Sequence, residues 1–222
     1  MHKDYLKNFH ATFFNKLFTL ANKKSIPYLI KSYNKNQIIA LANEPCTQVG
    51  IITKGEIRIE HLHISGNKTI INTLKQYDIF GEILIFSNES SYPFDIISNT
   101  KTDIFFITKL NLLRIFTEDI NLMEQFLNHI SSSYLNLNKL IKLKSQKTIE
   151  SKLAYYFLYF QNLSNNNLTC NIKNKTYLAD ILGVERQSLL RVLKKLQSDN
   201  CIIYNKKEIK ILNLSYFRNL IE

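Results

Sequence analysis

Asn174 to Leu196, NKTYLADILGVERQSLLRVLKKL, carries two helical patterns separated by a glycine. Apolar residues recur at helical spacing on both sides of Gly183, which predicts two short helices. Glycine adopts a left-handed conformation without steric cost, so Gly183 is the expected turn, and Asn174 is the expected N-cap of the first helix. The pattern is typical of a helix-turn-helix, whose second helix can enter the major groove of DNA.

The residues that follow distinguish this motif from an ordinary pair of amphipathic helices. Such pairs are common in proteins that bind no DNA, and basic residues often only keep a helix solvated. Here residues 201–204 and 208–212 form two apolar runs around the turn Asn205-Lys206-Lys207, which predicts a β-hairpin. A helix-turn-helix followed by a hairpin is a winged helix, and lysines at its tip would reach DNA phosphate.

The charge of the chain is concentrated around this motif. The 222 residues suffice for two domains, and the formal net charge is +11. Residues 138–222 hold 15 Lys and Arg against 6 Asp and Glu, or +9, whereas residues 1–137 hold 14 against 12, or +2. A lysine-rich composition alone does not predict this asymmetry, whereas a polyanionic partner explains it.

Other classes of protein lack support in the sequence. No apolar run has the length of a membrane span, and the N-terminus has no signal-peptide core, so we expect a cytoplasmic protein with no membrane partner. Cys46, Cys170 and Cys201 lie far apart, which favours buried apolar side chains over a zinc site or disulfides, with a redox role for Cys46 as the alternative. Without G-x-S-x-G, Walker A or H-E-x-x-H motifs, we expect no enzyme.

The N-terminal half is predicted to be mostly β-structure. After a helix over about residues 11–20, short β-rich runs alternate with polar turns, which predicts a small antiparallel barrel or roll. The expected strands are residues 37–41, 49–53, 56–64, 69–74 and 103–107.

The next helix has the most regular pattern in the chain. Seven residues follow one another at alternating spacings of 3 and 4, which is typical of a coiled-coil seam. A second row, Leu122, Phe126 and Leu140, is expected to pack on the β-domain. We therefore predict a dimerisation helix, with a helix buried within one subunit as the alternative. The seam residues are Ile120, Met123, Leu127, Ile130, Tyr134, Leu137 and Ile141.

These segments give an α+β fold in three parts. We expect a β-roll sensor domain over residues 1–118, a dimerisation helix over 119–145 and a winged helix-turn-helix domain over 146–222. Within the last part, residues 147–161 predict an apolar helix, 162–167 a polar loop and 215–221 a short closing helix.

This order of parts resembles the Crp–Fnr family of bacterial transcription regulators. The run VGIITKGEIRIEHLHISGNKTIINTLKQYDIFGE, residues 49–82, resembles the family's cyclic-nucleotide-binding β-roll. The run YLADILGVERQSLLRVLKKLQSDNCI, residues 177–202, resembles its DNA-binding signature. The segments FGEILIF and LGVERQSLLRVL are most similar to the YeiL-type branch. The resemblance covers about residues 9–214 and implies a homodimer that binds an inverted repeat of double-stranded DNA and contacts RNA polymerase.

The resemblance also implies which residues meet DNA. Arg186, Gln187 and Arg191 match the base-contacting positions of the family, since arginine can pair with guanine and glutamine with adenine. Glu185 opens the same helix and could accept a hydrogen bond from cytosine. The full set of expected DNA-binding residues is Lys175, Glu185, Arg186, Gln187, Ser188, Arg191, Lys206 and Lys207.

The effector pocket departs from the pattern of members that bind cyclic AMP. Those members carry an Arg-Ser pair that grips the cyclic phosphate, and an ungapped count places Tyr92-Pro93 there. Neither Arg nor Lys occurs between Lys75 and Lys101, and a buried phosphate without a cation is costly. The same count places Leu137-Asn138 opposite the purine. The matching pocket residues are Gly81, Glu82, Tyr92 and Asn138.

We therefore expect no resident cofactor. Cyclic AMP lacks its cation, and an oxygen-sensing iron–sulfur cluster lacks N-terminal cysteines, because Cys46 is the first. Haem or a metal would need a suitably placed ligand. His61 and His63 lie on one face of a strand end, which is more typical of solvated polar residues, and His129 lies in the dimerisation helix. The pocket holds an unknown small molecule or is filled by its own side chains. The alternative function is a signalling module that binds a ligand or protein and binds nucleic acid only non-specifically.

Overall fold

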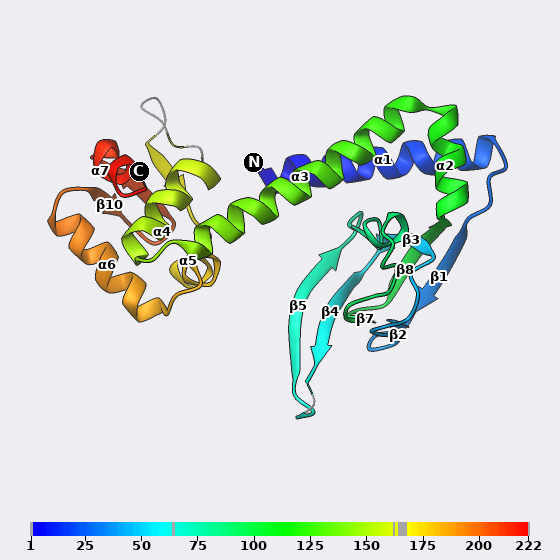
Figure 1. Ribbon diagram of the computed structural model, residues 1–222, viewed down its shortest axis with the longest axis horizontal. Helices are drawn as coiled ribbons and strands as arrows, with labels where there is room; N and C mark the ends of the chain where they lie inside the picture. The colour runs from blue at the N-terminus through cyan, green and yellow to red at the C-terminus, as the bar shows by residue number, and fades with distance from the viewer. Residues whose placement is uncertain (1, 64, 162, 164–167, 222) are drawn as a thin grey trace. The chain divides into compact units, whose positions relative to one another are not determined.

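The computed structural model describes residues 2–63, 65–161, 163 and 168–221, with side chains from residue 10 onward. The chain forms two compact units, Met1–Ile130 and Ser131–Glu222, shown as ribbons in Figure 1. Among the described residues, no helix has the length and apolar character needed to cross a membrane.

The first unit contains two antiparallel four-stranded sheets, which confirms the predicted roll. All five predicted strands form, with ends shifted by one or two residues, although Ile64 lies outside the described residues. Three short strands were not predicted, namely β1 (Leu29–Tyr33), β6 (Ile79–Phe80) and β7 (Asp95–Ser98). One sheet has the order β1 (Leu29–Tyr33), β8 (Thr102–Thr108), β3 (Gln48–Lys54) and β6 (Ile79–Phe80), and the other β2 (Ile38–Ala40), β7 (Asp95–Ser98), β4 (Glu56–Leu62) and β5 (Lys68–Lys75).

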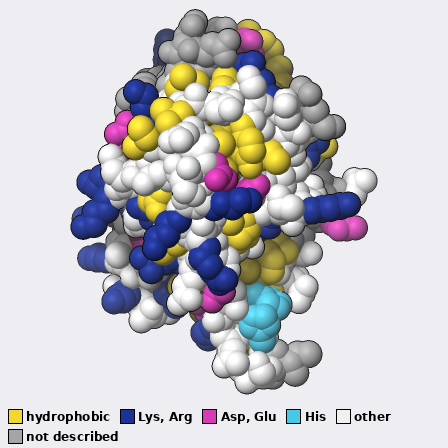
Figure 2. Space-filling model, turned by 90° about the vertical axis from the view of Figure 1, so that its left-hand side faces the viewer, with side chains coloured by type: hydrophobic (Ala, Val, Ile, Leu, Met, Phe, Trp, Pro, Cys, Tyr) yellow, Lys and Arg dark blue, Asp and Glu magenta, His cyan; other side chains and the backbone are white. Residues whose placement is uncertain are grey.

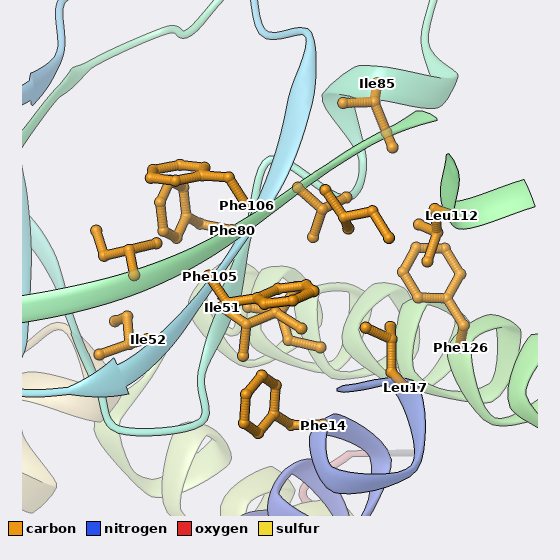
Figure 3. Packing of buried hydrophobic residues seen from close by; sticks show 14 of the residues in the cluster. Phe14, Leu17, Ile51, Ile52, Phe80, Ile85, Phe105, Phe106, Leu112 and Phe126 are labelled. Atoms are coloured by element: carbon orange, nitrogen blue, oxygen red, sulfur yellow. The ribbon is translucent and has the colours of Figure 1, made fainter. Parts of the chain in front are cut away.

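Three helices complete the core of this unit. They are α1 (His2–Lys23), α2 (Lys109–Glu118) and the first turns of α3 (Ile120–Ser145). In Figure 3, Phe14 and Leu17 of α1 and Phe126 of α3 lie with Phe105 of β8 in one apolar cluster. The helix predicted over residues 11–20 is thus the inner part of α1, and its apolar spacing reflects this buried face.

The two ends of α3 are buried in different cores. Leu122 and Phe126 are 1% and 3% exposed in the first unit, as predicted. Leu143 is fully buried in the second unit, and Leu140 packs against that same core. The prediction that Leu140 packs on the β-domain was wrong, because the helix leaves that domain's core after residue 130.

The second unit is a winged helix-turn-helix. Its helices surround a three-stranded sheet of order β10-β11-β9, in which β9 had not been predicted. The predicted loop 162–167 lies outside the described residues except for buried Leu163. The elements are α4 (Ile149–Tyr155), the π-helix η2 (Tyr156–Phe160), β9 (Thr169–Asn171), α5 (Lys175–Leu182), α6 (Arg186–Ser198), β10 (Ile202–Tyr204), β11 (Glu208–Ile211) and α7 (Leu214–Asn219).

The turn between α5 and α6 depends on Gly183. Its φ of 62° and ψ of 46° are left-handed, as the sequence predicts. The Val184 amide donates to Ala179 O at 3.0 Å, and the Gly183 amide donates to Asp180 O at 3.2 Å. These bonds satisfy carbonyls that the end of α5 would otherwise leave unpaired, and they fix the angle between the two helices.

Replacing Gly183 with alanine should therefore strain the turn without a clash. A Cβ at this position would meet only Lys144 Cε, at 4.0 Å, so the cost is conformational. We expect G183A to lower the free energy of unfolding by about 1–2 kcal/mol and G183N by less, because asparagine tolerates the left-handed region. Urea unfolding followed by far-ultraviolet circular dichroism measures both, and equal stability of G183A and the wild type would contradict this account.

Candidate DNA interface and effector site

The helix-turn-helix is capped and packed so that α6 presents a polar side to solvent. Asn174 Oδ1 accepts a hydrogen bond from the Tyr177 amide at 2.8 Å, which confirms the predicted N-cap of α5. At the start of α6, Glu185 has extended backbone, and its carboxylate makes no capping bond. Leu189, Leu193 and Leu196 are fully buried and anchor the opposite side of the helix.

The expected base-contacting residues lie on the solvent side of α6. Glu185, Arg186, Gln187 and Arg191 are exposed, and none is needed to cover the core. Ser188 is half-buried, and its Oγ accepts a hydrogen bond from Arg191 Nη2 at 3.4 Å. The structure therefore places these side chains where donors and acceptors could reach base edges in a groove.

The wing has a tip ordered by one asparagine. Asn205 Oδ1 accepts hydrogen bonds from the amides of Lys207 and Glu208, both at 2.9 Å. This Asx turn closes the predicted hairpin between β10 and β11 and leaves the side chains of Lys206 and Lys207 exposed.

Lys175 joins the wing to the helix-turn-helix. Its ammonium donates to Asn205 O at 2.6 Å and lies 4.9 Å from the centre of the Tyr204 ring. Burial lowers the pKa of Lys175, and the charges of Arg186 and Lys206 lower it further. The wing tip and the start of α6 thus bring three cations together, and a DNA phosphate placed there would relieve their repulsion.

Two other lysines of this unit serve the fold. Lys195 Nζ lies 2.9 Å from Glu150 Oε1, and the Tyr216 hydroxyl donates to Glu150 Oε2 at 2.9 Å, so one carboxylate joins α4, α6 and α7. Lys152 Nζ donates to Leu182 O at the end of α5, at 3.1 Å. The spacing of these residues in the sequence gave no signal of either contact.

Basic side chains nevertheless remain widespread on this side of the protein. Figure 2 views the molecule from the left-hand side of Figure 1 and shows Lys and Arg side chains, in dark blue, among polar, apolar and acidic ones. The distribution agrees with the charge asymmetry in the sequence and with a polyanionic partner.

The chain is tightly packed around Gly81, one of the predicted effector residues. Gly81 has a φ of 79°, and a Cβ there would lie 2.9 Å from both Cys46 Sγ and Gln48 O. Tyr92 is 9% exposed, and its hydroxyl lies on the same side of Gly81 as the Cys46 thiol. Burial raises the pKa of the Cys46 thiol, so it stays protonated and a poor nucleophile.

The remaining predicted effector residues have different surroundings. Glu82 lies beside His129 of α3, with Oε1 and Nε2 3.8 Å apart. Asn138 belongs to the second unit, where it is half-buried on α3. The structure therefore brings Gly81, Glu82 and Tyr92 together in the first unit.

The histidines and cysteines show no metal-binding cluster among the described residues. The rings of His61 and His63 meet edge to face at 4.6 Å, and His63 Nε2 lies 2.8 Å from Thr69 Oγ1. Cys46, Cys170 and Cys201 are buried free thiols, as the sequence predicts.

This fold and interface define a DNA-binding transcription regulator with a β-roll of the cyclic-nucleotide-binding type. The family model of the cyclic nucleotide-binding domain matches residues 30–119, and that of the Crp-like helix-turn-helix domain matches residues 151–220. The chain belongs to the Crp–Fnr family of transcription regulators, and it is not an enzyme.

Individual relatives agree over most of the chain. The global nitrogen regulator of Synechococcus elongatus is 21% identical over 203 residues, which cover 89% of this chain and 91% of the relative. The structure of a CooA mutant from Carboxydothermus hydrogenoformans has a TM-score of 0.55 and 16% identity, with 88% of each chain covered. A transcriptional regulator from Thermotoga maritima has a TM-score of 0.52 and 24% identity, covering 56% of this chain and 98% of its own.

Proposed function

We propose that the protein acts in the cytoplasm as a homodimer, binds an inverted repeat in DNA through α6 and regulates transcription through contact with RNA polymerase. The observation that carries this proposal is the exposed polar side of α6, with Arg186, Gln187 and Arg191 opposite a fully buried leucine side. Guanidinium and amide groups at the exposed start of a recognition helix are suited to reading base edges.

The exposed apolar row on α3 supports assembly into a dimer. Met123 and Ile130 are half-buried against their own unit, so part of the predicted seam also supports the fold. The other members are 52–63% exposed and still recur at coiled-coil spacing, so pairing with a second copy would remove them from water. They are Ile120, Leu127, Tyr134, Leu137 and Ile141.

The absence of a basic side chain at position 92 supports a sensor domain that does not bind cyclic AMP. Buried Tyr92 stands where the resemblance places a phosphate-binding arginine, and no Arg or Lys lies between Lys75 and Lys101. A cyclic phosphate there would lose its hydration without gaining the bidentate contact that an arginine at position 92 would provide.

A signalling module that binds nucleic acid only non-specifically is the second candidate, supported by the lysines at the wing tip. Such a protein would bind random DNA with strong salt dependence and select no palindrome. The exposed amide and guanidinium groups of α6 favour the sequence-specific regulator.

The dimer can be tested at Leu127. We expect L127E to dissociate the dimer, because it would place two like charges in an apolar contact, and to lose operator affinity. The matched control is L135E, since Leu135 is equally apolar and 58% exposed but lies outside the row. Sedimentation equilibrium decides the matter: a dimeric L127E protein would contradict the proposed interface.

Base reading can be separated from phosphate binding. We expect R186A and Q187A each to cost about 1–3 kcal/mol on the selected operator and to relax preference at one or two base pairs per half-site. K206A should weaken all sequences alike and reduce the salt slope by about one unit. Selection from random DNA should return inverted half-sites about one helical turn apart. Unchanged base preference in R186A, or no inverted repeat, would favour the non-specific module.

The effector prediction needs only purified protein. Calorimetry with cyclic AMP and cyclic GMP should show no saturable heat up to millimolar ligand, because the site lacks a cation for the phosphate. Operator DNA titrated into the same sample is the control for active protein. Micromolar affinity for either nucleotide would show that another group supplies the missing charge.

A further inference from the structure

Four ionisable side chains link α1 and α3 to the loop that holds Gly81 and Glu82. His10 Nε2 and His129 Nδ1 are 3.1 Å apart. At the two outer ends, His10 Nδ1 lies 3.5 Å from Asp78 Oδ1, and His129 Nε2 lies 3.8 Å from Glu82 Oε1. The side chains of His10, His129 and Glu82 are only 10%, 12% and 14% exposed, whereas Asp78 is 35% exposed, so water screens the inner contacts more weakly than the one to Asp78.

The number of ring hydrogens decides which of these contacts can form. Each contact is attractive only when one ring nitrogen carries a hydrogen, and two neutral imidazoles carry two hydrogens on four nitrogens. All three contacts therefore require one additional proton on the pair. A second additional proton would set two N–H groups against each other across the 3.1 Å separation and remove the central hydrogen bond.

Two carboxylates face the histidine pair among the described residues. The facing carboxylates are Asp78, in the turn before β6, and Glu82, after β6, with the neutral thiol of Cys46 close to Glu82. Burial would raise the pKa of Asp78, but the hydrogen bond from His10 and another from the Lys75 amide lower it below its ordinary value. One positive charge shared by the pair would thus lie between two negative ones.

We propose that His10 and His129 share one proton between Asp78 and Glu82, and that this proton fastens α1 and α3 to the effector loop and sets the affinity of the protein for DNA. The link to DNA affinity rests on the proposed dimeric function. Leu122 and Phe126 are buried and anchor the start of α3. The contact of His129 with Glu82 adds a further anchor two residues after Leu127 of the exposed row. Loss of the proton at higher pH releases that anchor and weakens the dimer and its operator binding.

Nuclear magnetic resonance of ¹⁵N-labelled histidine rings tests the shared proton in the full-length protein. Histidine changes charge between roughly pH 5 and 8, so this range covers the transition. We expect the signals of His10 and His129 to change together in two coupled steps. In H10Q the glutamine amide does not titrate, so His129 should follow a single step. Independent single-step curves for both rings in the wild type would overturn the shared proton.

Operator binding measured over the same range tests the consequence. One linked proton changes affinity by at most tenfold per pH unit. We expect wild-type affinity to fall about tenfold from pH 6 to pH 8, H10Q and H129A to fall less than about twofold, and the exposed-histidine control H61Q to match the wild type. A tenfold fall retained in H10Q would overturn the regulatory role. If the wild type bound no operator at any pH, the proposed function would fail, while the ring titration would still decide the shared proton.

Discussion

The structure depends on one helix having to satisfy two hydrophobic cores. Within α3, Leu122 and Phe126 are buried in the β-roll unit and Leu143 in the winged-helix unit. Between these anchors the helix has little apolar cover from either unit, and Tyr134 and Leu137 remain exposed. An apolar row at coiled-coil spacing that neither core buries is the feature on which the proposed dimer rests.

The basic charge of the second unit has two different uses. Lys195 and Lys152 are bound to Glu150 and to the Leu182 carbonyl, where they hold α4, α5 and α6 together. Lys175 instead has Arg186 and Lys206 as neighbours, and its pKa is lowered by burial and further by these two charges. A lysine that is paired with a carboxylate contributes little electrostatic attraction to a partner. Cations that lie near one another repel, and a bound phosphate reduces that repulsion. The net charge of the sequence therefore indicates which part of the chain binds the partner. Only the contacts in the structure show which cations are available to bind it.

The features that the sequence predicted are those encoded locally. The helix-turn-helix followed from the apolar spacing around Gly183, the N-cap at Asn174 and a hairpin with a polar turn, each formed by residues close together in the chain. Strands as short as β6, with two residues, have no periodicity to detect. Leu140 was assigned to the wrong core because helical spacing shows which side of a helix is apolar without showing what covers it. The contact between His10 and His129 joins residues 119 positions apart, beyond any local pattern.

The neutral packing around Gly81 and the contact of His129 with Glu82 both follow from the lack of basic side chains in the effector loop. Glu82 is 14% exposed, and a carboxylate at that depth needs a positive partner. The segment from Gln76 to Thr100 supplies none, since it contains neither Arg nor Lys. Tyr92 and Cys46 lie beside Gly81 as neutral groups, and the imidazole that faces Glu82 is that of His129 on α3. The proposed shared proton therefore links the effector loop to the helix that carries the exposed apolar row.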